Sequence, residues 1–239
     1  GGIASGGSGP GTNIMALDDS IYSSGAVGLA VAGEVDIDVI VSQGCQAVGP
    51  LMEVTESRGN VITELEGEAP LKLLQSAFAH LGPRHRSMVQ DGLLLGIVAD
   101  KTIEEPGPGD FLIRNVLGVD ESSGALTVTD FLRPGQRVRF FARDAQSVID
   151  DLELLLSPQA FSNAPSLGLL FTCNGRGSRL FGHPDGDIKI VMNALGKDCP
   201  VAGFVCAGEI GPIGAHNYIH GQTASIVLIR STPRQTNKS

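Results

Sequence analysis

Apolar residues occur in short runs along this chain, and two of the runs organise the rest. Residues 167–173 and 201–206 are almost continuously apolar, and runs of this length predict buried strands. Each run is followed by a glycine-rich polar stretch that carries one charged residue. This residue is Arg176 after the first run and Glu209 after the second. We therefore expect two buried strands that end in polar loops.

Strict alternation marks another strand at residues 35–41. Valine and isoleucine alternate there with two aspartates, so one side of the strand is apolar and the other polar. We predict that it forms a hairpin with residues 26–31, turning at Gly33. The same reasoning predicts a hairpin of residues 54–58 with 61–65, a buried strand at 93–98, an antiparallel meander of 111–117, 125–129 and 137–142, and a final strand at 225–229.

Three segments have the apolar spacing of helices. The first covers residues 68–81. The second is capped by Asp144 and ends before Pro158, because proline cannot continue a helix. The third starts at Asp185 and closes at Gly196, since glycine favours the position after a helix.

The remaining segments are interpreted as loops, including residues 1–11 and 83–90. Short strands joined by hairpins, with few helices, are typical of an α+β fold. We expect mostly antiparallel (mixed) β-sheets, with about three helices covering their outer faces.

Composition narrows the class of protein. The 239 residues are 42% hydrophobic and 18% charged, which is ordinary for a globular chain. The net charge of -9 and the scattered basic residues argue against a nucleic-acid partner. No apolar run reaches the roughly 18 residues of a membrane span. The four cysteines have no C-x-x-C spacing, so we expect reduced thiols and a soluble intracellular protein.

The two strand-and-loop motifs also carry a family resemblance. The runs FTCNGRGSRLFG, PVAGFVCAGEIGP and NYIHGQTAS resemble the C-terminal part of the FIST domain family, which occurs in bacterial signal-transduction proteins and, in eukaryotes, behind an F-box. The resemblance covers residues 25–228. It implies that residues 1–50 are the tail of the N-terminal FIST region and 51–230 the C-terminal FIST domain. We expect residues 231–239 to be a disordered tail.

The charged residues of the two loops are the first candidates for ligand binding. Arg176 could clamp a carboxylate in a bidentate pair, or it could be a solvated residue of a tight turn. Glu209 could bind a ligand amine, or it could pair with Arg176 and join the two loops. What the resemblance implies is a sensor of small molecules such as amino acids, whose two charges an arginine and a glutamate would match.

Further side chains border the same expected site. The full candidate set for ligand binding is Asn174, Gly175, Arg176, Gly177, Cys206, Glu209, His220 and Gln43.

Two rival chemistries are weaker. Cys206 and His220 would suit a thiol hydrolase, but a cysteine in an apolar strand is ordinarily inert. His183, His216 and His220 could bind a metal, with the last two spaced as on one helix face, but Pro212 and Gly214 indicate a loop. We therefore expect no catalytic residue, no metal site and no cofactor.

The sequence thus predicts a non-enzymatic sensory domain that binds a small, amino-acid-like polar ligand and acts on a signalling partner. The alternative is a protein-interaction domain that recruits substrates for an F-box ubiquitin ligase; in that case the partner is a ubiquitin-ligase component. We expect a cytoplasmic location. A plastid location stays open, because a transit peptide would lie upstream of this sequence.

Overall fold

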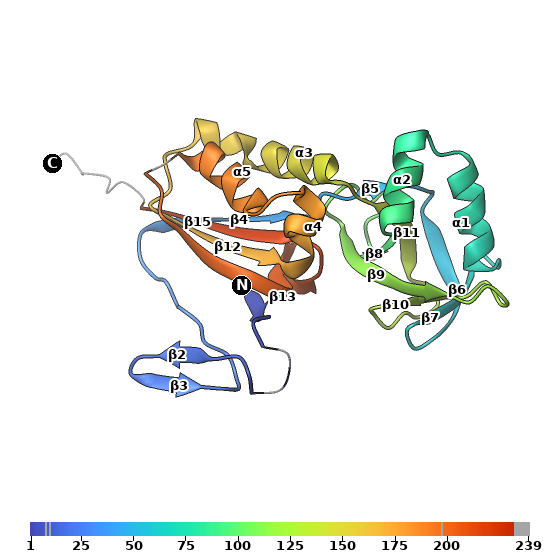
Figure 1. The fold of residues 1–239 in the computed structure, drawn as a ribbon, viewed down its shortest axis with the longest axis horizontal. Helices are drawn as coiled ribbons and strands as arrows, with labels where there is room; N and C mark the ends of the chain where they lie inside the picture. Colours follow the sequence, from blue (N-terminus) through green and yellow to red (C-terminus); the bar gives the residue numbers. More distant parts are fainter. Residues whose placement is uncertain (8, 10, 197, 232–239) are drawn as a thin grey trace.

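Two β-sheets organise the chain, one at each end of the molecule (Figure 1). The computed structural model describes residues 1–7, 9, 11–196 and 198–231. We call the two halves the sheet lobe and the barrel. The barrel occupies the middle of the sequence, and the sheet lobe is built from the segments on either side of it.

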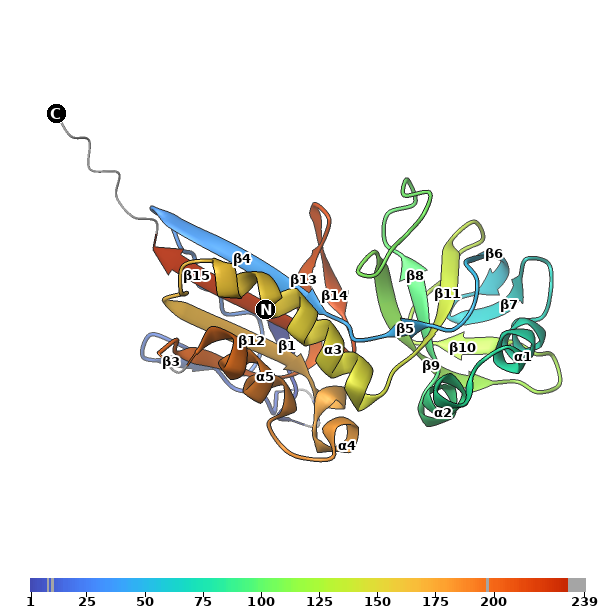
Figure 2. The ribbon, with the colours of Figure 1, turned by 90° about the horizontal axis from the view of Figure 1, so that it is seen from above.

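The sheet lobe contains a six-stranded sheet covered on one face by α3 (Ala145–Leu156) and α5 (Gly186–Leu195) (Figures 1 and 2). Only one neighbouring pair of its strands is parallel, and the other pairs are antiparallel. The strands are, in spatial order, β1 (Gly2–Ala4), β13 (Val201–Ile213), β12 (Leu167–Cys173), β15 (Ala224–Ser231) and β4 (Val35–Ser42), with β14 (His216–His220) paired to β13.

The barrel is a seven-stranded sheet that closes on itself, because its β11 pairs with both β6 and β8. Helices α1 (Pro70–Ala79) and α2 (Pro83–Asp91) pack outside it. Its strands are β5 (Gln46–Ala47), β11 (Arg137–Ala142), β6 (Met52–Arg58), β7 (Val61–Leu65), β10 (Leu126–Val128), β9 (Phe111–Val119) and β8 (Leu94–Val98).

Local sequence explains where the helices begin. The Asp144 side chain accepts a hydrogen bond from the Ser147 N–H at 2.7 Å, and the Ser147 hydroxyl accepts one from the Asp144 N–H at 3.0 Å. This capping box starts α3. Val148, Leu152 and Leu156 then recur every four residues and are buried against the sheet. The small elements that complete the fold are β2 (Met15–Leu17), β3 (Ser20–Tyr22), η1 (Ser157–Phe161), η2 (Asn174–Arg176) and α4 (Ser178–Phe181).

The α+β class and the three predicted helices are confirmed, although the described residues contain five α-helices rather than about three. The interpretation of residues 83–90 as a loop was wrong. Pro83 stands at the first helical turn and Met88 is buried, so this segment is the amphipathic helix α2. The prediction of a loop at residues 1–11 was wrong at one place, since β1 pairs with β13.

Two predicted strand pairings were also wrong. Residues 26–31 form no strand, and β4 pairs along its whole length with β15 instead. The three predicted meander strands exist, but β10 pairs with β7 and β9, and β11 pairs with β8. Closing the barrel requires this arrangement, since a simple meander would leave β8 and β6 as open edges. The expected disordered tail lies, apart from Ser231, outside the described residues.

The second predicted loop was wrong as well. Residues 208–212 continue β13, and β14 pairs back onto them. The glycines serve close packing rather than turning: a Cβ on Gly211 would stand 2.6 Å from Val41 Cγ2, which real structures do not tolerate. Sequence patterns cannot distinguish these two uses of glycine. Because the strand continues through residues 208–212, Glu209 belongs to β13 and not to a loop.

Candidate functional site

The candidate site lies where β12 ends. β12 and β13 are parallel, and α5 lies on the path between them, so their carboxyl ends meet at one edge of the sheet. After Cys173 the chain makes the single 3₁₀ turn η2, in which Cys173 Sγ accepts a hydrogen bond from the Gly175 N–H at 3.5 Å. The turn places Arg176 under α5, where only 2% of the residue is exposed.

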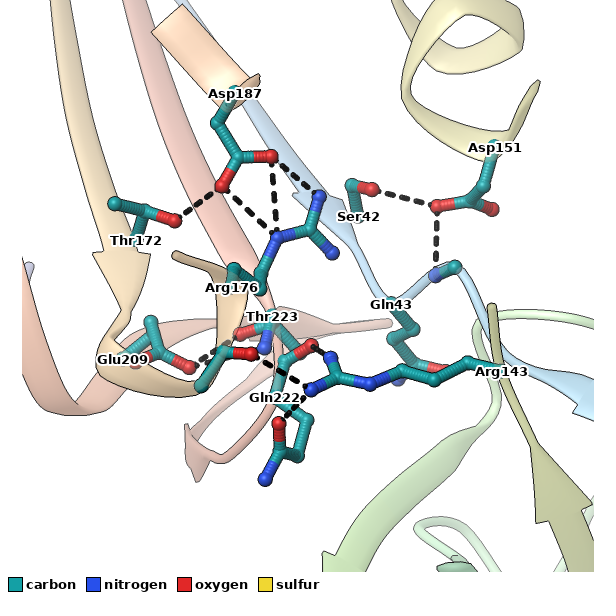
Figure 3. Close-up of polar contacts among 12 residues, drawn as sticks. Ser42, Gln43, Arg143, Asp151, Thr172, Arg176, Asp187, Glu209, Gln222 and Thr223 are labelled. Carbon is teal, nitrogen blue, oxygen red and sulfur yellow. Dashed lines mark hydrogen bonds and ion pairs between the residues drawn. The ribbon is translucent and has the colours of Figure 1, made fainter. Parts of the chain in front are cut away.

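Arg176 forms a buried, bidentate ion pair with Asp187 in the first turn of α5 (Figure 3). Arg176 Nη2 donates to Asp187 Oδ1 at 2.7 Å, and Nε donates to Oδ1 at 3.2 Å and to Oδ2 at 3.1 Å. The Thr172 hydroxyl donates to the same carboxylate. The bidentate face of the guanidinium is thus used within the protein, and among the described residues Nη1 has no hydrogen-bond partner.

Glu209 is fully buried on β13. Its Oε2 accepts hydrogen bonds from the Thr223 hydroxyl at 2.8 Å and from the Thr223 N–H at 3.2 Å (Figure 3). Burial raises the pKa of the Glu209 carboxyl above its usual value, and the hydrogen bonds from Thr223 oppose this only in part.

The expected pairing of Glu209 with Arg176 was wrong, because the ion pairs of the described residues join Arg176 to Asp187. The crossover helix α5 brings its own carboxylate over the end of β12. Asp187 is therefore the site residue that sequence reasoning missed. The sequence feature that could have identified Asp187 is its position. It follows Arg176 by 11 residues, at the start of the predicted helix that lies between the two apolar runs.

Three polar atoms of the candidate residues are buried without a hydrogen-bond partner among the described residues. They are Arg176 Nη1, Glu209 Oε1 and His220 Nδ1. A buried polar group left unpaired costs about 1–3 kcal/mol, so most native structures satisfy such groups. In Figure 3, Nη1 points away from Asp187. Of these three residues, only Arg176 also borders the cavity described next.

A cavity of about 330 Å³ borders the Arg176–Asp187 pair. Ligand pockets begin at about this size. Its polar end is formed by Thr172, Cys173, Arg176, Gly177 and Asp187. Its apolar lining includes Leu170, Ile188, Val201 and Val205. Of the candidate residues from the sequence, Arg176 and Gly177 border this cavity.

The remaining turn residues face the barrel. Arg143, which follows β11, donates to the Gly175 carbonyl at 3.1 Å and to the Gln222 carbonyl at 3.0 Å (Figure 3). Gln222 Nε2 in turn donates to Asn115 Oδ1 of β9 at 2.8 Å. A Cβ on Gly175 would stand 2.5 Å from Gln222 Oε1, so a larger residue there would have to displace the Gln222 side chain. The turn η2 is thus connected to the barrel through Arg143.

A second connection joins the lobes beside β4. Asp151 of α3 accepts a hydrogen bond from the Ser42 hydroxyl at 2.7 Å and one from the Gly44 N–H at 3.0 Å (Figure 3). Gln43 is buried and donates to the Phe111 carbonyl of the barrel at 2.6 Å. Gln43, proposed from the sequence as part of the pocket wall, lies at this junction rather than in the cavity beside Arg176.

Cys206 and His220 have the environment of inert core residues. The Cys206 thiol donates to the Phe204 carbonyl at 3.4 Å, and burial raises its pKa to about 11, so the thiolate needed for nucleophilic attack is disfavoured. His220 Nε2 lies 2.9 Å from the Gly211 carbonyl, and burial lowers the pKa of this imidazole. The geometry gives no support to the hydrolase alternative.

The three histidines considered as metal ligands do not gather. His216 and His220 lie on strand β14 rather than on a helix face, while His183 precedes α5. No group of three potential ligands occurs in the part of the chain that the structure describes. None of the described helices is long and apolar enough to cross a membrane.

Comparison with known proteins identifies the class. Residues 70–212 match the model of the FIST C domain and residues 1–68 that of the FIST N domain, and the chain belongs to the FIST family. The boundary between the two matches falls between β7 and α1, inside the barrel.

Curated relatives are bacterial. An uncharacterized protein of Mycobacterium tuberculosis (strain CDC 1551 / Oshkosh) is 43% identical over 230 residues, which cover 95% of this chain and 60% of the relative. An uncharacterized protein of Mycobacterium bovis (strain ATCC BAA-935 / AF2122/97) is 42% identical over 231 residues, covering 95% and 59%. The chain therefore spans about three fifths of the length of these relatives.

Proposed function

We propose that this chain is the ligand-binding part of a FIST sensory protein, and that the cavity beside Arg176 takes a small polar molecule. The observation that carries the proposal is Arg176 itself. It is a buried arginine with an unpartnered Nη1 among the described residues, at the edge of a cavity of about 330 Å³. Buried donors of this kind are costly unless something accepts their hydrogen bond.

The lining of the cavity suggests the chemistry of the ligand. Nη1 requires an acceptor, which a carboxylate supplies best. Asp185 and Asp187, rather than Glu209, are the carboxylates that border the cavity. Each oxygen of Asp187 already accepts two hydrogen bonds, from Arg176 and Thr172, so the exposed Asp185 is the carboxylate that would accept a bond from a ligand amine. Leu170, Ile188 and Val201 provide an apolar wall for the rest of the molecule. A small amino acid with an apolar side chain satisfies all three requirements.

The same geometry suggests how binding is read out. A ligand that draws Arg176 toward itself moves the turn η2, and the Gly175 carbonyl of that turn accepts a hydrogen bond from Arg143. Arg143 also donates to Gln222, and Gln222 donates to Asn115 on the barrel. Binding would thereby alter the junction between the lobes, which a signalling partner can detect. The roles of Asn174, Gly175, Cys206, Glu209, His220 and Gln43 in ligand binding stay predictions.

The other expectations have no observation that favours them over this proposal. The F-box alternative, the non-enzymatic character, the absence of a nucleic-acid partner and the cytoplasmic location stay predictions. Only the membership of the FIST family is shown.

The test is thermal unfolding against a panel of free amino acids and small organic acids. A ligand at about 100 times its dissociation constant should add roughly 2.7 kcal/mol to the free energy of unfolding. Replacing Arg176 is a poor test, because Asp187 would be left as an unpaired buried charge, at a cost of about 3–5 kcal/mol. Gly177→Val is better: it borders the cavity, and its new Cβ would contact only the Asn174 carbonyl, at 3.9 Å.

The expected result is a ligand-induced shift that Gly177→Val abolishes. Gly118→Val is the matched control, since Gly118 is exposed on β9 with open space around its Cβ position. Val205→Trp, at a half-exposed wall of the cavity, repeats the test if Gly177→Val disturbs the fold. A panel without any shift, or a shift that both cavity variants retain, would remove the ligand site from this cavity.

A further inference from the structure

The six-stranded sheet is apolar on both faces, but helices cover only one of them. On the covered face, Leu170, Ile226 and Leu228 pack against α3 and α5 and are 0–6% exposed. Strands of a sheet that is buried on one face ordinarily alternate between apolar and polar side chains. Here the alternate positions are apolar as well.

Register places these alternate side chains together on one surface. Phe171 is the neighbour of Phe204, Leu169 the neighbour of Val227, and Val227 the neighbour of Val39. Ile37 on β4 extends the row beyond Val39. We call this surface the open face, defined by Ile37, Val39, Leu169, Phe171, Phe204 and Val227.

The open face is exposed and uncharged. Ile37, Val39 and Phe204 are 46%, 42% and 44% exposed. The Phe171 and Phe204 rings contact each other edge to face, with centroids 5.4 Å apart. None of the positions that the register of β4, β12, β15 and the first half of β13 places on this side carries a charge. Apolar patches of this kind on a protein mark contact surfaces.

We infer that the open face is covered, in longer FIST proteins, by a layer of secondary structure with one apolar face that comes from the same polypeptide. The curated relatives supply the length for it, since this chain covers only about 60% of them. A second sheet packed at about 10 Å would bury the whole face.

The FIST N segment of this chain already reaches around that side. β1 pairs with β13 at the edge of the sheet, and the β2–β3 hairpin stands away from the sheet on the side opposite α3 and α5 (Figure 1). Apolar side chains of this segment are themselves exposed, with Ile21 at 74% and Leu29 at 82%. A layer between the hairpin and the open face would contact both, which favours an intramolecular occupant over a separate partner.

The experiment uses the full-length relative from Mycobacterium tuberculosis (strain CDC 1551 / Oshkosh). Aspartates replace the residues aligned with Val39 and Phe204, both on the open face. The matched control places aspartates at the positions aligned with Leu117 and Val119, which are exposed apolar residues of a barrel strand at 62% and 38%. The measurements are the melting temperature of each protein and the molar mass of the present chain by light scattering.

The inference predicts that the open-face aspartates lower the melting temperature of the full-length relative by about 10 °C or more, or prevent its folding, because two charges become buried. The control pair should change it by only a few degrees. In the present 239-residue chain, Val39→Asp with Phe204→Asp should lower the melting temperature by only a few degrees, because only half-buried apolar area is lost. Equal effects of both pairs in the relative would overturn the inference. So would a dimer of the present chain that the open-face pair dissociates, because the occupant would then be a second copy.

Discussion

The barrel and the sheet lobe bury the apolar side chains of their strands in different ways. The barrel closes by pairing β11 with β8, so its strands surround one core in which Val54, Ile62 and Phe140 are 0% exposed. The sheet lobe stays open at β4 and beside β1. Its helices bury one face, while Val39 and Phe204 on the other face remain more than two fifths exposed.

The difference shows where each lobe is self-sufficient. A closed sheet has no free edges and no second face to cover. An open sheet with two apolar faces needs a layer on each. The polar residues discussed above lie at the junction of these two architectures, where β12 ends and the chain passes to and from the barrel. Substitutions can test this contrast directly.

The largest expected effect comes from the barrel core. Phe140→Ala should lower the free energy of unfolding by about 3–5 kcal/mol, because a fully buried ring leaves a cavity behind. Phe204→Ala, at 44% exposure, should cost only about 1–1.5 kcal/mol for half-buried area and the lost ring contact. Denaturant unfolding of both variants measures the difference. Equal losses would mean that the open face is already covered in this chain.

The next effect concerns the junction. Asp151→Ala removes the acceptor for Ser42 and Gly44 and should cost about 1.5–3 kcal/mol, as hydrogen bonds to charged groups do. Arg84→Ala, which breaks the solvent-exposed Arg84–Asp144 pair, should cost clearly less, because exposed ion pairs contribute little to stability. The same unfolding assay compares the two variants. A loss for Asp151→Ala no greater than that for Arg84→Ala would show that the junction contributes little.

The smallest effect is a difference in pH dependence between two acids. The pKa of Glu209 is raised from 4.5 by burial, so the folded state holds its proton more tightly than the unfolded state. Its contribution to stability is therefore full below pH 4.5 and is lost as the pH rises through the folded pKa. Glu209→Gln should raise the melting temperature at neutral pH and flatten that decline.

Asp144 should change the pH dependence of stability in the opposite direction. Its pKa is lowered to about 2, first by the hydrogen bond from Arg84, so its contribution is present above the unfolded value of 3.8 and is lost as the pH falls toward 2. Asp144→Asn should therefore flatten the acid limb only. Melting curves measured from about pH 2 to about pH 8 separate the two groups, because the folded-state pKa values are shifted in opposite directions. A Glu209→Gln protein with an unchanged profile above pH 4.5 would contradict the assignment.

Periodicity predicted most of the strands and the three main helices, because each of these has a clear apolar face. Periodicity failed where tertiary contacts determine the secondary structure. Residues 83–91 form α2 because its short apolar face, Met88 and Val89, packs against the core of the barrel. The glycines at 208 and 211 sit inside a strand because neighbouring side chains approach them closely. Neither fact is visible in local sequence.

The geometry around Arg176 was predicted in part. The turn after β12 and the position of Arg176 in it followed from the motif, but the partner of Arg176 did not. Pairing Arg176 with Glu209 assumed that charged residues at adjacent strand ends meet. The structure instead supplies Asp187 from the crossover helix, 11 positions later in sequence. Arg143 and Asp151 were missed because nothing in the sequence shows that the barrel interrupts the sheet lobe between β4 and α3.

That interruption makes the barrel an insertion. β4 ends at Ser42 and α3 starts at Ala145, and the two are fastened to each other by Asp151 and by the Ser147 hydroxyl, which donates to the Gly44 carbonyl at 2.9 Å. The chain thus leaves and re-enters the sheet lobe at neighbouring points. A short linker could replace everything between them without altering the order of the remaining strands, and a different module could be spliced into the same place.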